Sequence, residues 1–243
     1  MENKILFLDY DGVLFDTLRE VYIVNRYLYL NKDFACPIDE ENYELYSKYK
    51  YLIYNIWMFY YYNPLIFNSN NPDKIEELFT LALNKRDKFK EEKYCREFLD
   101  IRSKLIKENY DFWKNLEKPY EFFKNIKKLY EEKNINLVIV SKKNKDSILE
   151  RFEANGFKLD EKYVFAREIL DRYMSKADFM AEYMINNGFK QAIFVDDNYN
   201  NLLPCKRYPA IQTILALWGN SGNKYAGMSQ EEAFKKIFEF FTK

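Results

Sequence analysis

Near its N-terminus the chain reads Ile5-Leu6-Phe7-Leu8-Asp9-Tyr10-Asp11-Gly12. The four consecutive apolar residues predict a strand covered on both faces, as in a parallel sheet. Asp9 and Asp11 lie two residues apart, so in an extended chain their carboxylates leave on the same face. Two anions held that close need a cation or a shared proton, and Gly12 lets the chain turn sharply after them. The pattern indicates a catalytic arrangement at the end of a strand, with an Asp-rich turn as the alternative.

The composition limits the classes of protein that need to be considered. The chain has 243 residues, of which 48% are hydrophobic, with 38 basic and 38 acidic side chains. This length allows one large domain or two small ones, and the neutral balance argues against a nucleic-acid partner. Three scattered cysteines and a first apolar segment of only four residues favour a reducing, cytoplasmic location without a signal peptide. The oligomeric state stays open.

The sequence contains no histidine. This excludes Ser-His-Asp and Cys-His nucleophilic schemes as well as histidine-based zinc sites. Acid–base chemistry would have to come from carboxylates, lysines or tyrosines. A bound metal would be held by oxygen ligands, which favours magnesium over zinc.

Strand and helix patterns alternate through the C-terminal half, which predicts an α/β fold with a parallel sheet. Pro119 is expected to open the first helix, Gly156 to end the second, and Ser175 to cap the third. The predicted strands cover residues 135–140, 163–165, 192–195 and 211–217, and the predicted helices cover 119–133, 144–155, 175–187 and 229 onward.

Residues 16–117 differ, because they show helical periodicity and no convincing strand. Breaks are expected near Cys36-Pro37, near Asn63-Pro64 and over residues 68–72. The predicted organisation is a catalytic core of residues 1–15 and 118–243, with an all-helical domain of residues 16–117 inserted after the first strand.

The segment 43–62 carries ten aromatic side chains in twenty residues. Its uncharged part is twelve residues long before Asn63-Pro64, whereas a membrane span needs about twenty, so no stable membrane span is expected. The segment is predicted to form an aromatic helix that packs and lines a pocket. Contact with a membrane surface or a partner is the alternative.

Polar residues also follow the other predicted strands. Ser141-Lys142 comes after Val140, where a hydroxyl and backbone N–H groups would suit a phosphate oxygen. Asp196-Asp197 follows Val195, with Asn201 shortly after. Lys176 lies in the first turn of a helix, where a cation is unfavourable for the helix and invites a functional explanation.

In this order, the residues resemble the motifs of the haloacid dehalogenase superfamily, in its phosphatase branch with a helical C1-type cap. Residues 9–13 resemble the first motif, Ser141 the second, Lys176 the third, and Asp196-Asp197 with Asn201 the fourth. The resemblance covers residues 1–16 and 118–243, and Trp218-Gly219 also fits the family pattern. It implies a Rossmann-like core with helices on both faces and a helical cap inserted at residues 16–117. Lys145 is a rival for the third motif, and Lys142-Lys143 replaces an asparagine that many capped members carry.

The resemblance also implies roles for these residues. Mg²⁺ would be held by Asp9, Asp197 and the backbone carbonyl of Asp11. Asp9 would attack phosphorus and form an aspartyl-phosphate, and Asp11 would act as general acid and base. The residues implied to bind phosphate are Gly12, Ser141, Lys142 and Lys176. Asp196 and Asn201 would hold the residues that contact the substrate in position.

The function implied by the resemblance is a magnesium-dependent phosphatase acting on a small phosphorylated metabolite, such as a sugar or amino-alcohol phosphate. Tyrosines of the cap are expected to face that substrate, among them Tyr43, Tyr46, Tyr51 and Tyr54. A phosphomutase, phosphotransferase or phosphonatase on the same fold is one alternative. A non-catalytic binding or regulatory protein is the other.

Overall fold

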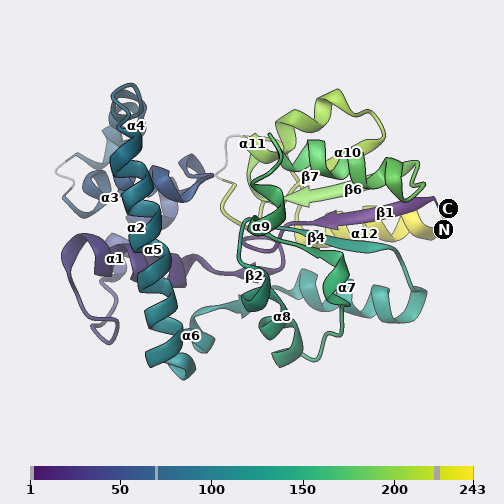
Figure 1. Cartoon of the computed structure of the whole chain (residues 1–243), viewed down its shortest axis with the longest axis horizontal. Coiled ribbons are helices and arrows are strands. Elements are labelled where there is room, and N and C mark those ends of the chain that lie inside the picture. The colour runs from purple at the N-terminus through teal and green to yellow at the C-terminus, as the bar shows by residue number, and fades with distance from the viewer. Residues whose placement is uncertain (1–2, 69–70, 222–224, 243) are drawn as a thin grey trace. The chain divides into compact units, whose positions relative to one another are not determined.

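The computed structural model describes residues 3–68, 71–221 and 225–242. The chain divides into two compact units. The first, called the core unit, consists of Met1–Asp16 and Pro119–Lys243, and the second, called the helical unit, consists of Thr17–Lys118. Each unit is described by itself below (Figure 1).

The core unit is built on a parallel sheet of five strands in the order β5-β4-β1-β6-β7. Each neighbouring pair of strands in this sheet is parallel, which confirms the predicted α/β class. The carboxyl ends of β1, β4 and β6 therefore meet at one edge. The strands are β1 (Lys4–Leu8), β4 (Leu137–Val140), β5 (Val164–Phe165), β6 (Gln191–Asp196) and β7 (Ile211–Leu215).

Helices cover both faces of this sheet, because alternate residues of each strand point to opposite sides. Leu6 and Leu8 pack in one buried cluster with α7, α8 and α12, whereas Ile5 and Phe7 pack in another with α9, α10 and α11. Figure 1 shows the sheet between these two groups. The helices are α7 (Glu121–Lys133), α8 (Lys145–Ala154), α9 (Arg167–Leu170), α10 (Lys176–Asn186), α11 (Tyr199–Leu202) and α12 (Gln230–Thr242).

Helix ends in the core unit follow the sequence signals except at α7. Ser175 caps α10 by accepting from the N–H of Asp178, and Gly156 adopts a φ of 64° just after α8. Pro119, however, was expected at the start of α7 and instead lies in strand β3 (Lys118–Pro119). The side-chain oxygen of Gln230 accepts from the N–H of Phe122 at 2.7 Å. A cap from so far along the chain leaves no local sequence signal.

The helical unit encloses its own hydrophobic core. A buried carboxylate, Glu20, accepts from Arg102 at 2.7 Å and from the indole of Trp113 at 2.6 Å. This network ties α1 to α5 and α6, since an unpaired buried charge would be costly. The helices are α1 (Leu18–Leu30), α2 (Glu40–Tyr49), α3 (Phe59–Phe67), α4 (Ile75–Leu83), α5 (Lys88–Glu108) and α6 (Tyr110–Leu116).

The prediction of a single aromatic helix over residues 43–62 is wrong. Helix α2 ends at Tyr49, two short 3₁₀ turns follow, and α3 begins at Phe59. Ile53 and Asn55 between them are extended. The expected break at Asn63-Pro64 is absent, because α3 runs through Pro64 and buries Phe59, Tyr62, Asn63 and Ile66. Tertiary packing outweighs the lost backbone donor there. Of the break expected over 68–72, residues 69 and 70 lie outside the described residues.

The chain leaves the core unit and returns to it through neighbouring segments. Strand β2 (Phe15–Asp16) pairs with β3 in a two-stranded sheet. The N–H of Tyr120 also donates to the carbonyl of Leu14 at 3.0 Å. The two ends of the long insertion are thus hydrogen-bonded to each other beside the end of β1.

Candidate active site

The turn after β1 fixes the backbone of Asp9 and Asp11. The N–H of Asp9 donates to the carbonyl of Val195 at 3.0 Å, which continues the β1–β6 pairing by one residue. Tyr10 is buried and stacks on Phe15, with 4.8 Å between ring centroids. Its N–H donates to Oδ1 of Asp9 at 2.7 Å. The Asp9 carboxylate is consequently buried at the carboxyl edge of the sheet, whereas the side chain of Asp11 is 38% exposed.

Lys176, from the first turn of α10, brings its ammonium group between two carboxylates. Its Nζ lies 2.7 Å from Oδ2 of Asp9 and 2.8 Å from Oδ2 of Asp196, and all three side chains are buried. Burial alone would lower the pKa of Lys176, but the charges of Asp196 and Asp9 outweigh it and raise that pKa. The rival Lys145 lies elsewhere, at 3.9 Å from Glu161.

Asp9 is held in surroundings that disfavour its negative charge. Desolvation raises the pKa of Asp9 to about 7, against the opposing effect of Lys176, and Asp196 and Asp11 raise it further. A second cation beside this carboxylate would favour the ionised form. The geometry therefore suits a carboxylate that works together with a bound cation.

Both carboxylate oxygens of Asp196 accept hydrogen bonds from other groups of the protein. Asp196 is fully buried, and it accepts from the N–H of Asn198 at 2.8 Å. The amide of Asn201 donates to both of its oxygens, at 3.1 and 3.0 Å, in addition to the contact with Lys176. This arrangement orients the lysine and suits the supporting role expected for Asp196 and Asn201.

Asp197 points toward the turn after β1, where two glycines make room for it. Gly12 has a φ of 74°, and a Cβ added to it would meet Oδ2 of Asp197 at 1.9 Å. A Cβ on Gly219 would meet the carbonyl of Gly12 at 2.2 Å. Asn220, which the sequence analysis missed, donates to Oδ2 of Asp197 from its backbone at 2.7 Å and its amide at 3.1 Å. The sequence signal for this loop was Trp218-Gly219, which fits the family pattern and directly precedes Asn220.

Asp9, Asp196 and Asp197 together form a group of carboxylates that could hold a metal ion. One oxygen from each lies within 4.8 Å of the others, and all three residues are buried. An all-oxygen donor set fits a hard cation such as Mg²⁺. Because the oxygens of Asp196 already accept several hydrogen bonds, we expect Asp9 and Asp197 to be the direct carboxylate ligands. Asp11 adds no carboxylate to this group, and its expected contribution is a backbone carbonyl.

Ser141 and Lys142 follow β4, the neighbour of β1 in the sheet. Ser141 is buried, and its hydroxyl oxygen accepts from the N–H of Lys143 at 3.3 Å. Lys142 is an exposed residue. The pKa of its ammonium group is nevertheless lowered, first by desolvation and then by the nearby positive charge of Lys176. Ser141 and Lys142, two of the predicted phosphate-binding residues, thus follow a strand that ends at the same edge of the sheet as Asp9.

Lys143 is a member of the site that the sequence analysis did not select. It is buried, and its Nζ lies 3.3 Å from Oδ1 of Asp11 and 5.3 Å from the ring centre of Tyr10. Two adjacent lysines after a strand give no local sign of which one turns inward. The alternation of an extended chain gives a hint, since Lys143 shares a side with Ser141.

Solved structures with the same fold match the chain over almost its whole length. An inferred phosphoglycolate phosphatase from Lactobacillus delbrueckii is 13% identical, with a TM-score of 0.63, and the match covers 98% of this chain and 99% of that one. A haloacid dehalogenase-like family hydrolase from Streptococcus pneumoniae is 12% identical, with a TM-score of 0.57 and coverages of 96% and 97%. A predicted phosphatase from Clostridium acetobutylicum is 15% identical, with a TM-score of 0.58 and coverages of 98% and 99%.

The chain therefore has the fold of the haloacid dehalogenase-like hydrolases, with a Rossmann-like core and a helical insertion. At the level of sequence, no protein-family model and no curated protein matches the chain. Among the described residues, no helix has the length and apolar character that crossing a membrane requires.

Proposed function

We propose that this protein is a magnesium-dependent phosphatase that hydrolyses a small phosphorylated metabolite through a phosphorylated Asp9. The observation that carries the proposal is the buried Asp9 carboxylate, held 2.7 Å from Lys176 at the carboxyl edge of the sheet. A buried nucleophile beside a fixed cation is what phosphoryl transfer requires, because positioning and charge stabilisation supply most of its catalysis.

In the first step, an oxygen of Asp9 attacks phosphorus while the bond from phosphorus to the ester oxygen breaks. Lys176 and Ser141 bind the oxygens of the phosphoryl group and stabilise their charge. The departing oxygen takes a proton from Asp11. When bound, magnesium supplies positive charge that lets an anionic carboxylate approach an anionic phosphate.

In the second step, Asp11 takes a proton from a water molecule, which attacks phosphorus. The bond between Asp9 and phosphorus breaks, so that inorganic phosphate leaves and Asp9 is restored. Asp11 is suited to both steps because its side chain is partly exposed, whereas Asp9 is buried. Lys143, at 3.3 Å, would hold the Asp11 side chain in place.

The helical unit would act as the cap that excludes water and contacts the organic part of the substrate. Tyr46 is removed from the expected contact residues, because it is fully buried inside the helical unit and its hydroxyl accepts from Asn25 at 2.8 Å. Tyr43, Tyr51 and Tyr54 stay candidates for that role.

The experiment is a phosphate-release assay on the purified full chain with Mg²⁺. Its panel contains sugar phosphates, amino-alcohol phosphates, nucleotides and phosphoglycolate, the last because a structural neighbour carries that name. Asp9→Asn should lower turnover by about a thousandfold or more while the protein still melts cooperatively, because an amide is not an anionic nucleophile. Retention of more than a few per cent of the rate would reject Asp9 as the nucleophile.

The products decide between hydrolysis and transfer. Release of inorganic phosphate, with a phosphorylated Asp9 trapped by mass spectrometry, supports the phosphatase. Phosphate recovered on a second organic molecule would instead identify a mutase or phosphotransferase.

A further inference from the structure

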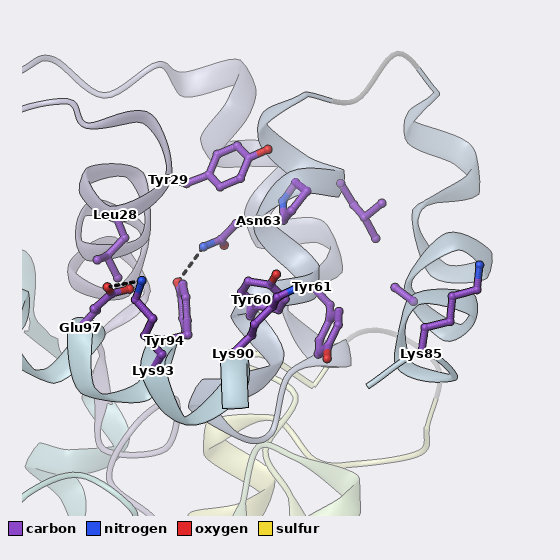
Figure 2. Close-up of a pocket in the computed structure, with 13 residues that line it drawn as sticks. Leu28, Tyr29, Tyr60, Tyr61, Asn63, Lys85, Lys90, Lys93, Tyr94 and Glu97 are labelled. Carbon is purple, nitrogen blue, oxygen red and sulfur yellow. Dashed lines mark hydrogen bonds and ion pairs between the residues drawn. The ribbon is translucent and has the colours of Figure 1, made fainter. Parts of the chain in front are cut away.

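A second site lies wholly within the helical unit. It is a cavity of about 800 Å³ between α1, α3, α4 and α5 (Figure 2). This volume is in the range of cavities that hold small organic ligands. All the described residues that line it belong to the helical unit, and none of them is a residue of the carboxylate group described above.

The walls of the cavity are mostly aromatic and apolar. Tyr29, Tyr60, Tyr61 and Tyr94 contribute rings, and Leu28, Leu65, Pro64 and Ala82 fill the space between them. The rings of Tyr60 and Tyr61 stand nearly perpendicular, with 5.0 Å between centroids. Perpendicular rings present both a face and an edge, which favours a planar aromatic guest.

Three lysines give the cavity a positive charge, against one carboxylate from Glu97. Lys93 lies 3.7 Å from Glu97, and Lys90 lies 3.4 Å from Asp87. Lys85, by contrast, makes no ion pair with any residue in the described part of the chain. An anion bound in the cavity would therefore find its best partner in Lys85.

The cavity wall also contains a buried acceptor without a donor. The amide nitrogen of Asn63 donates to Oδ1 of Asn25 at 3.0 Å and to the hydroxyl of Tyr94 at 2.8 Å, as Figure 2 shows for Tyr94. These bonds fix the orientation of the amide, since turning it over would place two amide oxygens together. The Asn63 oxygen then has no hydrogen-bond partner among the described residues. Because this oxygen is inaccessible, the Asn63 amide serves as a fixed part of the wall and not as a contact for a ligand.

We propose that this cavity binds an organic anion with a planar aromatic body, its negative group at Lys85 and its ring between the tyrosines. The site is complete within the helical unit and does not depend on the proposed phosphatase activity. A molecule bound there would be a second ligand of this chain, different from the phosphorylated substrate of the proposed reaction.

The test uses two fluorescent probes on the full chain in the presence of EDTA. One is 8-anilinonaphthalene-1-sulfonate, an aromatic anion, and the other is N-phenyl-1-naphthylamine, its uncharged analogue. Neither contains a phosphate ester, so loss of the proposed catalysis would not affect the measurement. The wild-type protein should bind the sulfonate saturably at one site, and more tightly than the amine.

Two variants locate the binding site. Ala82→Trp should weaken saturable binding of both probes, because the indole would project from the lining and take up space that the probe needs. Lys85→Glu should weaken binding of the sulfonate about tenfold or more and leave the amine unchanged, since only the charge contact is reversed. Lys85 is exposed, so this variant should fold even if Ala82→Trp does not.

Lys107→Glu is the matched control, because Lys107 is an exposed lysine of α5 outside the cavity lining. It should bind both probes as the wild type does. Competition experiments with AMP, GMP, CMP and UMP then test whether a nucleotide displaces the sulfonate from the cavity. The proposal is overturned if the wild type shows no saturable site, or if Lys85→Glu and Lys107→Glu weaken sulfonate binding equally.

Discussion

The ammonium nitrogen of Lys143 lies 3.3 Å from Oδ1 of Asp11, and the lysine side chain is 5% exposed whereas the aspartate is 38% exposed. A rigid, buried cation thus holds a partly exposed carboxylate in place. Because Asp11 is the proposed acid and base, Lys143 is a positioning residue whose effect should pass through Asp11 alone.

Lys143→Met keeps the length of the side chain and removes its charge. We expect hydrolysis of an alkyl phosphate to fall about tenfold to a hundredfold, the range that positioned proton transfer supplies. The double variant with Asp11→Asn should be no slower than Asp11→Asn by itself. Lys145→Met, at a surface lysine, serves as the control. Multiplicative losses in the double variant would show that Lys143 acts independently of Asp11.

Asp11→Asn should discriminate between substrates by their leaving groups. A p-nitrophenolate ion departs with little need of a proton, whereas an alkoxide needs one in the transition state. The loss of kcat/KM, which covers the steps up to departure of the leaving group, should therefore be larger for an alkyl phosphate than for p-nitrophenyl phosphate. Steady-state kinetics on both esters measures this difference, and equal losses would exclude Asp11 as the general acid.

Activity should require magnesium. EDTA is expected to abolish it, Mg²⁺ to restore it and Zn²⁺ to restore it poorly, because Asp9 and Asp197 offer oxygen ligands only. Calorimetry on the protein without substrate should show Mg²⁺ binding that Asp197→Ala weakens. A purified protein that is fully active with stoichiometric zinc would contradict this assignment.

Asp178 should make the stability of the fold depend on pH. Its pKa is lowered by hydrogen bonds from Tyr208 at 2.6 Å and Ser175 at 2.7 Å, and by the charge of Arg207. A lowered folded-state pKa gives stability that is present above the unfolded value and is lost as the pH falls through the folded value.

At neutral pH, Asp178→Asn should therefore reduce the free energy of unfolding by about 1 kcal/mol, a modest value because the side chain is partly solvated. Urea titrations between pH 7 and the acid limb measure the difference from the wild type. That difference should shrink as Asp178 becomes protonated. A difference that is constant across this range would contradict the assignment.

Much of the core could be predicted from the sequence, because its strands are short apolar runs that end in polar residues. The run before Asp9 and the run before Asp196 are strands β1 and β6, and parallel pairing brings their ends together. Periodicity could not locate Lys143 or Asn220, since their places depend on how two loops fold back on Asp11 and Asp197. Their catalytic roles, like those of the predicted site residues, stay predictions.

The helical unit was predictable as a class but not in its segmentation. The interruption between Tyr49 and Phe59 contains no glycine or proline, and the hydroxyl of Tyr49 donates to the carbonyl of Pro72 across the unit. Long-range contacts of this kind set the helix ends. Pro64 gave a misleading signal for the same reason, because the buried residues around it keep α3 continuous.

The pairing of β2 with β3 has a consequence for how such a chain can vary. The insertion begins after β2 and ends at β3, and these two strands are hydrogen-bonded neighbours. Its two ends are therefore close together, as the ends of a hairpin loop are. The entropy of closing a loop grows only slowly with its length. Helices can therefore be added, lost or exchanged beyond β2 and β3 without changing the register of the five-stranded sheet, so that the carboxylate group at its edge and the helical unit can vary independently.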